Sequence, residues 1–128
     1  MRVSGWESRL AAYLENAPAF QWGENDCALW AAKWVAECTG DDHTGEWLGY
    51  YRTERGAKIR MTRLGYRGVA AIASAHLSEI PLSLAGRGNL ILHPQGSLGI
   101  CAGLHSHFLT VDGMTTERTL NCLEAWKV

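Results

Sequence analysis

The sequence predicts an α+β fold in which N-terminal helices pack on a small antiparallel sheet. Apolar residues recur at helical spacing through the first 80 residues, and short β-rich runs separated by Gly, Pro and Asp follow Gly86. The chain has 128 residues, of which 47% are hydrophobic and 20% charged. These values are typical of one globular domain, residues 1–128, that buries a core of its own.

Two helices are predicted within the first 40 residues. The first begins at Ser4, with Glu7 three residues further on as in a capping box, and ends before Pro18. The second begins near Asp26 and ends at Gly40, since glycine readily adopts the left-handed conformation that closes many helices. Its apolar stripe is the most regular in the chain and consists of Cys27, Trp30, Ala31, Trp34, Val35 and Cys38.

Two further helices and four strands complete the predicted fold. We expect a loop or a short helix over residues 41–53, followed by helices over residues 54–64 and 69–80. The runs that read as strands are residues 89–93, 97–103, 107–113 and 125–128.

The charges argue against a general affinity for nucleic acid or membranes, because the formal net charge is −1. They are nevertheless segregated: residues 1–50 carry eight acidic and three basic residues, whereas residues 51–70 carry one acidic and six basic residues. We expect the basic segment, residues 52–67, to be a solvated helix face, with contact to an acidic partner or polymer as the alternative. No apolar run approaches the roughly 20 residues that span a bilayer, and the N-terminus lacks the apolar core of a secretory signal.

Six tryptophans and four cysteines are the unusual features of the composition. The tryptophans are expected to anchor the core, with an aromatic contact surface as the alternative. No CxxC pair occurs, so free thiols are expected at Cys27, Cys38, Cys101 and Cys122. A metal site that combines His105 and His107 with Cys101 and Cys122 lacks tight ligand spacing. We therefore predict neither a metal nor another cofactor.

Cys27 is the candidate for chemistry because it falls in the first turn of the second helix. Unsatisfied backbone N–H groups and the helix dipole at that position favour the thiolate, which predicts a lowered pKa. Gly23 would permit a sharp turn into the helix, and Asn25 or Asp26 could cap it. Cys27 also fits the buried stripe of the same helix, so a core residue is the alternative.

A nucleophilic thiol needs a base, and the sequence holds five histidines. His43 is expected to be solvated in a loop, and His76 to be a structural or surface residue of a helix. The strand-rich half supplies the three remaining candidates, which are His93, His105 and His107.

The stretch FQWGENDCALWAAKWV, followed by Gly40 and Asp41, resembles the NlpC/P60 superfamily of papain-like cysteine hydrolases. More closely, the whole chain resembles small NlpC/P60-like proteins encoded in bacteriophage and prophage tail gene clusters. The further matches are the segments ERGAKIRMTRLGY and RGNLILH, the strand SLGICAG, the VDGM turn and the terminal AWKV.

This resemblance implies a hydrolase that cleaves peptides of the cell wall, with Cys27 as nucleophile. It places Ser97 where the family carries its base histidine, and Asn89 where active members usually carry aspartate. The residue that orients the base would fall near His107 or Phe108. Serine cannot accept a proton near neutral pH as imidazole does, so the resemblance implies a catalytic pair without its base.

The sequence therefore predicts a structural or assembly protein of a bacteriophage tail, near the tail tip, on a catalytically degenerate NlpC/P60-like fold. Other tail proteins would be its partners, with host peptidoglycan as a further one, and it would reside in the virion after synthesis in the host cytoplasm. The alternative is an active peptidase or amidase that cleaves peptidoglycan peptides during entry, with His93, His105 or His107 as substitute base. A third hypothesis is a small domain of the host with an unrelated binding role.

Overall fold

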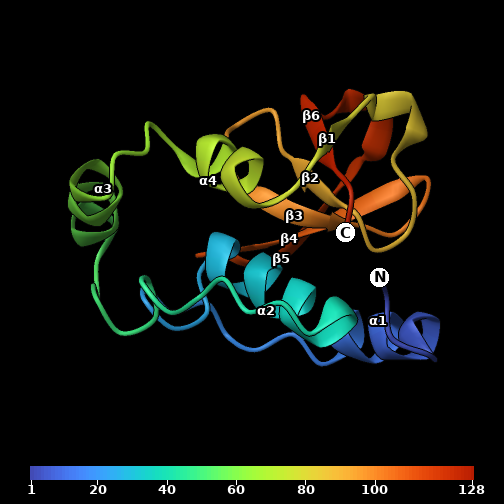
Figure 1. The fold of residues 1–128 in the computed structure, drawn as a ribbon, viewed down its shortest axis with the longest axis horizontal. Coiled ribbons are helices and arrows are strands. Elements are labelled where there is room, and N and C mark those ends of the chain that lie inside the picture. Colours follow the sequence, from blue (N-terminus) through green and yellow to red (C-terminus); the bar gives the residue numbers. More distant parts are fainter.

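The computed structural model describes residues 1–128 and shows an α+β fold of four helices and one six-stranded antiparallel sheet (Figure 1). The helices are α1 (Trp6–Glu15), α2 (Cys27–Thr39), α3 (Glu54–Arg63) and α4 (Val69–His76). The strands are β1 (Glu79–Ile80), β2 (Leu90–Leu92), β3 (Leu98–Cys101), β4 (His105–Thr110), β5 (Gly113–Arg118) and β6 (Glu124–Trp126). They lie in the order β1-β6-β2-β3-β4-β5, and two 3-10 helices, η1 (Leu82–Leu84) and η2 (Thr119–Asn121), complete the chain.

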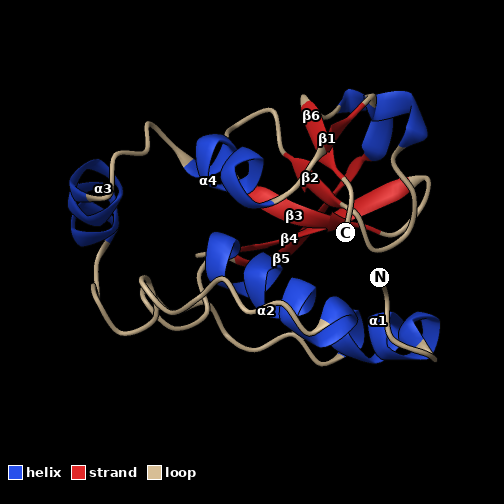
Figure 2. Ribbon diagram, in the orientation of Figure 1, coloured by secondary structure: helices blue, strands red, loops and turns tan.

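Helix α2 packs against one face of the sheet and supplies the centre of the core. Figure 2 shows α1 and α2 together on the same side of the strands. The indole N–H of Trp34 donates a hydrogen bond of 2.8 Å to the carbonyl oxygen of Gly88, which ties α2 to the start of β2. The ring of Tyr13 in α1 stacks on Trp30 with 5.6 Å between centroids. The sheet residues buried in this cluster are Leu90, Leu92, Leu98, Ile100, Leu109 and Trp126.

The opposite face of the sheet carries a smaller cluster formed by Ile91, Phe108, Cys122 and Ala125. Gly99 in β3 makes this packing possible, since a Cβ atom there would lie 2.3 Å from the carbonyl oxygen of His107 and 2.3 Å from the Phe108 ring. The bare backbone of Gly99 therefore lets β3 and β4 pair while Phe108 covers the strand.

The ends of α2 agree with the sequence prediction, whereas the start of α1 does not. Asp26 caps α2 with its side chain, and Gly40 closes the helix with a φ of 87°. The cap of α1 is Gly5, in the left-handed conformation and without a side-chain hydrogen bond, so the predicted capping box at Ser4 is wrong. The third helix is close to prediction, with Thr53 as its cap.

The predicted fourth helix is too long, and strands β1 and β5 were not predicted. Helix α4 ends at His76, because Glu79 and Ile80 leave the helix to pair with Trp126 and Ala125 of β6. Strand β5 pairs with β4 along its whole length, but most of its residues are exposed. An exposed strand needs no buried apolar face, and its sequence GMTTER therefore lacks the alternation of apolar and polar residues that predicts a strand. Residues 41–53 form turns without a helix.

Most of the tryptophans are core anchors, as predicted. Four of them are buried, and no tryptophan occurs among the large apolar side chains that are exposed.

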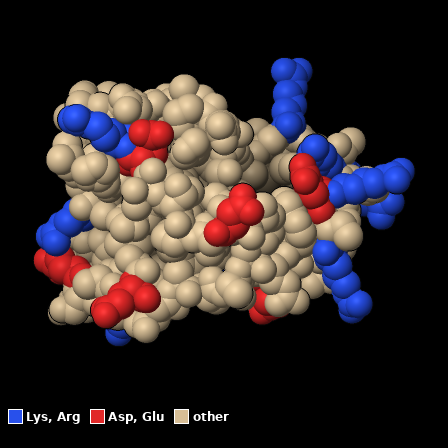
Figure 3. Space-filling view, turned by 180° about the vertical axis from the view of Figure 1, so that it is seen from behind, with Lys and Arg blue, Asp and Glu red and all other residues tan.

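Helix α3 buries only Ala57 and stands apart from the sheet (Figure 1). Lys and Arg side chains gather at that end of the molecule (Figure 3), so residues 52–67 present an exposed basic face. None of the helices is both long and apolar enough to span a bilayer.

Replacement of Gly99 by alanine tests the packing of β3 against β4. We expect Gly99→Ala to lower the free energy of unfolding by about 1–3 kcal/mol, because the new methyl group overlaps backbone and ring atoms. Urea denaturation followed by circular dichroism measures the change. Gly45→Ala is the matched control, since no atom lies within 4 Å of its added Cβ. Equal effects of the two variants would contradict this account of Gly99.

Candidate functional site

The turn that precedes α2 is held in place by the chain segment that ends at Tyr51. Gln21 and Asn25 form an isolated antiparallel bridge that closes the turn. Between them Gly23 has a φ of 78°, and a Cβ atom on it would lie 1.8 Å from the carbonyl oxygen of Tyr51. The Gly23 carbonyl accepts a hydrogen bond of 2.9 Å from the N–H of Gly49. Glycine at position 23 is therefore required both by its conformation and by this close approach.

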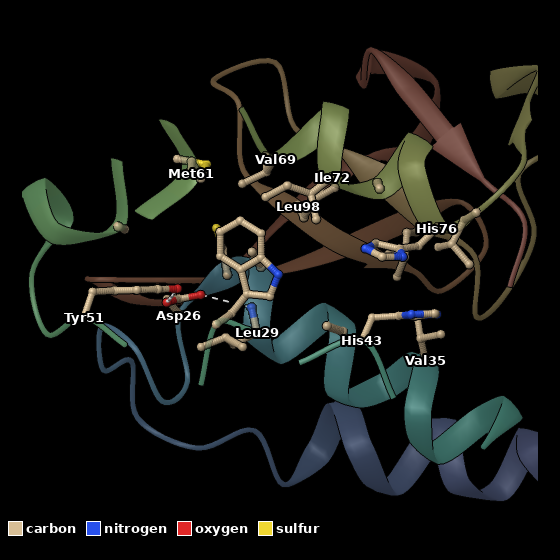
Figure 4. A pocket seen from close by; sticks show the side chains of 18 of the residues that line it. Asp26, Leu29, Val35, His43, Tyr51, Met61, Val69, Ile72, His76 and Leu98 are labelled. Carbon is tan, nitrogen blue, oxygen red and sulfur yellow. Dashed lines mark hydrogen bonds between the residues drawn. The ribbon is translucent and has the colours of Figure 1, made fainter. Parts of the chain in front are cut away.

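The carboxylate of Asp26 joins that turn to α2 and to Tyr51 (Figure 4). Asp26 is only 2% exposed. Its Oδ1 accepts from the N–H of Leu29 at 3.0 Å, and its Oδ2 accepts from the N–H of Gly23 at 3.1 Å and the hydroxyl of Tyr51 at 2.6 Å. Burial and this carboxylate raise the pKa of Tyr51, so the phenol keeps its proton and remains a donor. All three donors come from within the chain, and the buried charge is satisfied.

Cys27 is the first residue of α2, and its half-buried thiol faces the start of β3. Burial raises the pKa of the thiol above its usual value, and the negative charge of Asp26 raises it further. The backbone N–H groups of Leu98 and Ala28 and the hydroxyl of Ser97 act in the opposite direction, since each can donate a hydrogen bond to the thiolate.

The expectation of a lowered pKa at Cys27 is therefore wrong, because burial raises the pKa of the thiol and the charge of the helix cap adds to that effect. A helix N-terminus does favour a thiolate, but the residue that caps this helix is itself an ionisable acid. The cap carboxylate lies beside the thiol and opposes the dipole at short range. The sequence prediction counted Asp26 as a cap without counting its charge.

Ser97 is the predicted site residue that the structure brings next to Cys27, and His93 is not. Along β2 the side chains alternate, so His93 follows Ile91 onto the sheet face that points away from α2. The His93 ring meets Phe108 edge-on with 4.9 Å between centroids. Its Nδ1 accepts a hydrogen bond of 3.0 Å from the backbone N–H of Gln95.

His105 and His107 lie on the face of β4 that points toward α2, but both are too far along the strand to reach Cys27. They share the face of Leu109, which packs with α2. His107 pairs with Ile100, which is three residues, or about 10 Å, along β3 from Ser97. Burial lowers the pKa of His107, and His105 is exposed and lies two residues further along β4 from Ser97. No hydrogen bond joins either imidazole to the thiol.

The remaining positions implied by the resemblance have structural contacts. Phe108 belongs to the cluster on the far face of the sheet. Asn89 is buried, and its Oδ1 accepts from Arg2 Nη2 at 3.0 Å and from the N–H of Val128 at 3.2 Å. Asn89 thus fastens both ends of the chain to β2.

An apolar cavity of about 100 Å³ lies beside Cys27, among α2, α3, α4 and the segment between α2 and α3 (Figure 4). Sixteen of its nineteen lining residues are hydrophobic, and the polar ones are Asp26, His43 and His76. The rings of His43 and His76 stack with 4.4 Å between centroids, beside Val35 and toward the other end of the cavity from Asp26 (Figure 4). His76 lies at the surface, and partial loss of solvent together with the neighbouring His43 lowers its pKa.

The cavity and its histidine pair were missed by sequence reasoning. His43 and His76 were expected to be separate loop and helix residues, and they are 33 positions apart. Only the packing of α4 over α2 brings them together, and neither position carries a local pattern that would reveal this.

Metal-ligating side chains do not gather in this structure. All four cysteines are free thiols, and Cys38, Cys101 and Cys122 are buried. No group of three or more His, Cys, Asp or Glu side chains is placed to hold a metal ion. The Cys101 sulfur lies 3.7 Å from the hydroxyl of Thr119.

Fold and site together define an α+β protein with a cysteine at a helix N-terminus, a buried acidic cap and a serine at the facing strand. The chain belongs to the family described as a domain of unknown function, DUF6950, which matches residues 1–128. No curated protein and no solved structure matches the chain.

Replacement of Asp26 by asparagine tests the electrostatics of the thiol. Asparagine is also a good helix cap, so Asp26→Asn removes the charge and keeps a capping oxygen. We expect the pKa of Cys27 to fall, because the nearby negative charge that disfavours the thiolate is gone. Alkylation of Cys27 by iodoacetamide, followed by mass spectrometry across pH, should then reach half its maximal rate at a lower pH. Glu37→Gln, which removes an exposed charge from the same helix, should leave the profile in place. A profile unchanged in Asp26→Asn would contradict the assigned role of the cap.

Proposed function

We propose that this chain is a structural or assembly protein of a bacteriophage tail, at the tail tip, built on an NlpC/P60-like fold that has lost catalysis. The observation that carries the proposal is the pairing of Cys27 with Ser97, where active relatives would present an imidazole.

The arrangement of α2 against β3 supports the NlpC/P60-like assignment. The resemblance requires a cysteine at the start of a helix to face the first residue of the strand SLGIC. Cys27 and Ser97 meet in this way. Gly99 within that strand is required by packing against Phe108, which accounts physically for the glycine of the matched segment.

The chemistry of the pair supports a loss of catalysis. A general base must come within about 3 Å of the proton that it removes. The serine hydroxyl is a poor base near neutral pH, and His107 lies about 10 Å along the sheet from Ser97. The raised pKa of Cys27 keeps the sulfur protonated, and a thiol is a much weaker nucleophile than a thiolate.

The surface supports a role in assembly. Four exposed leucines lie in η1, in η2 or in the segments next to η2: Leu84, Leu104, Leu120 and Leu123, with exposed fractions of 69%, 63%, 63% and 57%. Thr119 of η2 donates to the carbonyl of Leu104, which holds that loop against η2. Exposed apolar side chains that gather in this way favour contact with another protein.

The second candidate is an active cysteine peptidase or amidase that acts on peptidoglycan peptides. The observation in its favour is that His43 and His76 line the same cavity as Cys27. They lie beside Val35 (Figure 4), which is eight residues, or about 12 Å, further along α2 than Cys27. A base at that distance would require a large movement of α4 and of the segment that carries His43.

An activity assay separates these two candidates. We expect the wild-type protein to leave muropeptides intact and to react slowly with iodoacetamide at Cys27. Ser97→His should accelerate alkylation of Cys27 at neutral pH, because an imidazolium beside the sulfur stabilises the thiolate. Ser83→His, the same change at an exposed position of η1, is the control and should have no effect. Muropeptide cleavage by the wild type that is lost in Cys27→Ala would overturn the proposal that this fold has lost catalysis.

The assembly role is tested in the phage or prophage that encodes the chain. We expect mass spectrometry of purified tails to find the protein in a fixed ratio to the other tail proteins. Deletion of its gene should abolish infectious particles, whereas a Cys27→Ala copy should restore the titre because no chemistry at the sulfur is needed. Absence of the protein from tails, or rescue by the wild type but not by Cys27→Ala, would contradict the proposal.

A further inference from the structure

The cavity beside Cys27 is not filled by side chains and is poorly suited to bound water. At about 100 Å³ it is larger than the space that one water needs. Bound water requires two to four polar partners, yet both oxygens of Asp26 are already engaged by donors of the protein. The hydroxyl of Tyr51 is likewise directed at Asp26. Most of the wall is aliphatic or aromatic, so water in its central part would lose hydrogen bonds.

An empty cavity would also be unfavourable, because the atoms that line it lack dispersion partners on one side. Its floor consists of buried residues of α2 and the sheet, namely Leu29, Val35, Leu90 and Leu98. Its other walls include half-buried Trp22, Met61 and Ile72, so the space is not sealed from solvent. A cavity that is apolar, accessible and not closed by the side chains that line it is suited to an apolar ligand.

Helix α3 forms one wall of this cavity and has few buried contacts. It contributes Ala57 and Met61 to the lining, and Ala57 is the sole residue of the helix that is buried. Arg60 holds α3 to the preceding segment through a hydrogen bond of 2.8 Å from Nε to the carbonyl of Glu46, and its guanidinium lies 3.8 Å from the centroid of the Tyr50 ring. These contacts lie at the surface, so a small displacement of α3 would admit a ligand without disturbing the sheet.

We propose that this cavity is a binding site for a small, uncharged apolar ligand, of the size of a short alkyl chain or a benzene ring. Comparable apolar cavities in proteins bind benzene. A charged ligand should bind more weakly, because the only charged group of the wall, the carboxylate of Asp26, is already engaged by three donors. The stacked rings of His43 and His76 provide hydrogen-bonding atoms at one end, where a hydroxyl group of the ligand would lie. This proposal concerns the isolated chain and does not depend on the role in a phage tail.

Methyl NMR with 1-hexanol as the probe tests the site. In protein labelled at the methyl groups of Ile, Leu and Met, we expect saturable shifts at Met61, Ile72 and Leu98. Hexylammonium has the same chain length and carries a charge, so it should bind about tenfold or more weakly. Saturation with 1-hexanol should also slow the alkylation of Cys27 by iodoacetamide, because the sulfur lies in the same wall.

Filling the cavity provides the matched variants. Ala73→Leu places extra methyl groups in the lining of α4 and should abolish the shifts, whereas Ala75→Leu makes the same change at an exposed position of that helix and should retain them. Ala32→Leu fills the cavity from α2 and serves if Ala73→Leu does not fold. The proposal is overturned if 1-hexanol gives no saturable shift at these methyl groups. It is also overturned if a folded filled variant binds as the wild type does, or if hexylammonium binds equally well.

Discussion

The buried carboxylate of Asp26 is the interaction on which the site depends. It caps α2, closes the turn at Gly23 and receives the hydroxyl of Tyr51, so three segments of the chain meet at one side chain. A carboxylate can be buried only when such donors satisfy it, and each donor is fixed by a different piece of backbone. The start of α2, and with it the position of Cys27, is therefore determined by contacts that reach from residue 23 to residue 51.

The same interaction limits the chemistry of the thiol. Burial against β3 works against the thiolate, and the charge that secures the helix start lies next to the sulfur and adds to the effect. Stability of the site and reactivity of Cys27 are thus opposed at this helix terminus. A cationic base beside the sulfur would offset both contributions, and Ser97 cannot supply that charge.

Sequence patterns were most informative where residues within one element determine the structure of that element. The periodic stripe, the acidic cap and the closing glycine gave α2 almost to the residue, because helix caps and amphipathic faces are local properties. The pairing of Cys27 with Ser97 was expected from the resemblance alone, since 70 positions separate the two residues. Strands β1 and β5 were not expected, because their partners β6 and β4 hold them through backbone hydrogen bonds rather than through an apolar pattern of their own.

By itself the sequence determined the α+β class, the start and end of α2, the exposed basic helix and the core role of most of the tryptophans. These follow from composition, capping and periodicity, which act over a few residues. Tertiary structure alone decided the pKa direction of Cys27, the distance of each histidine from it, and the apolar cavity with its stacked histidine pair. Those properties depend on which distant segments pack together, and on how much water and charge that packing leaves around each side chain.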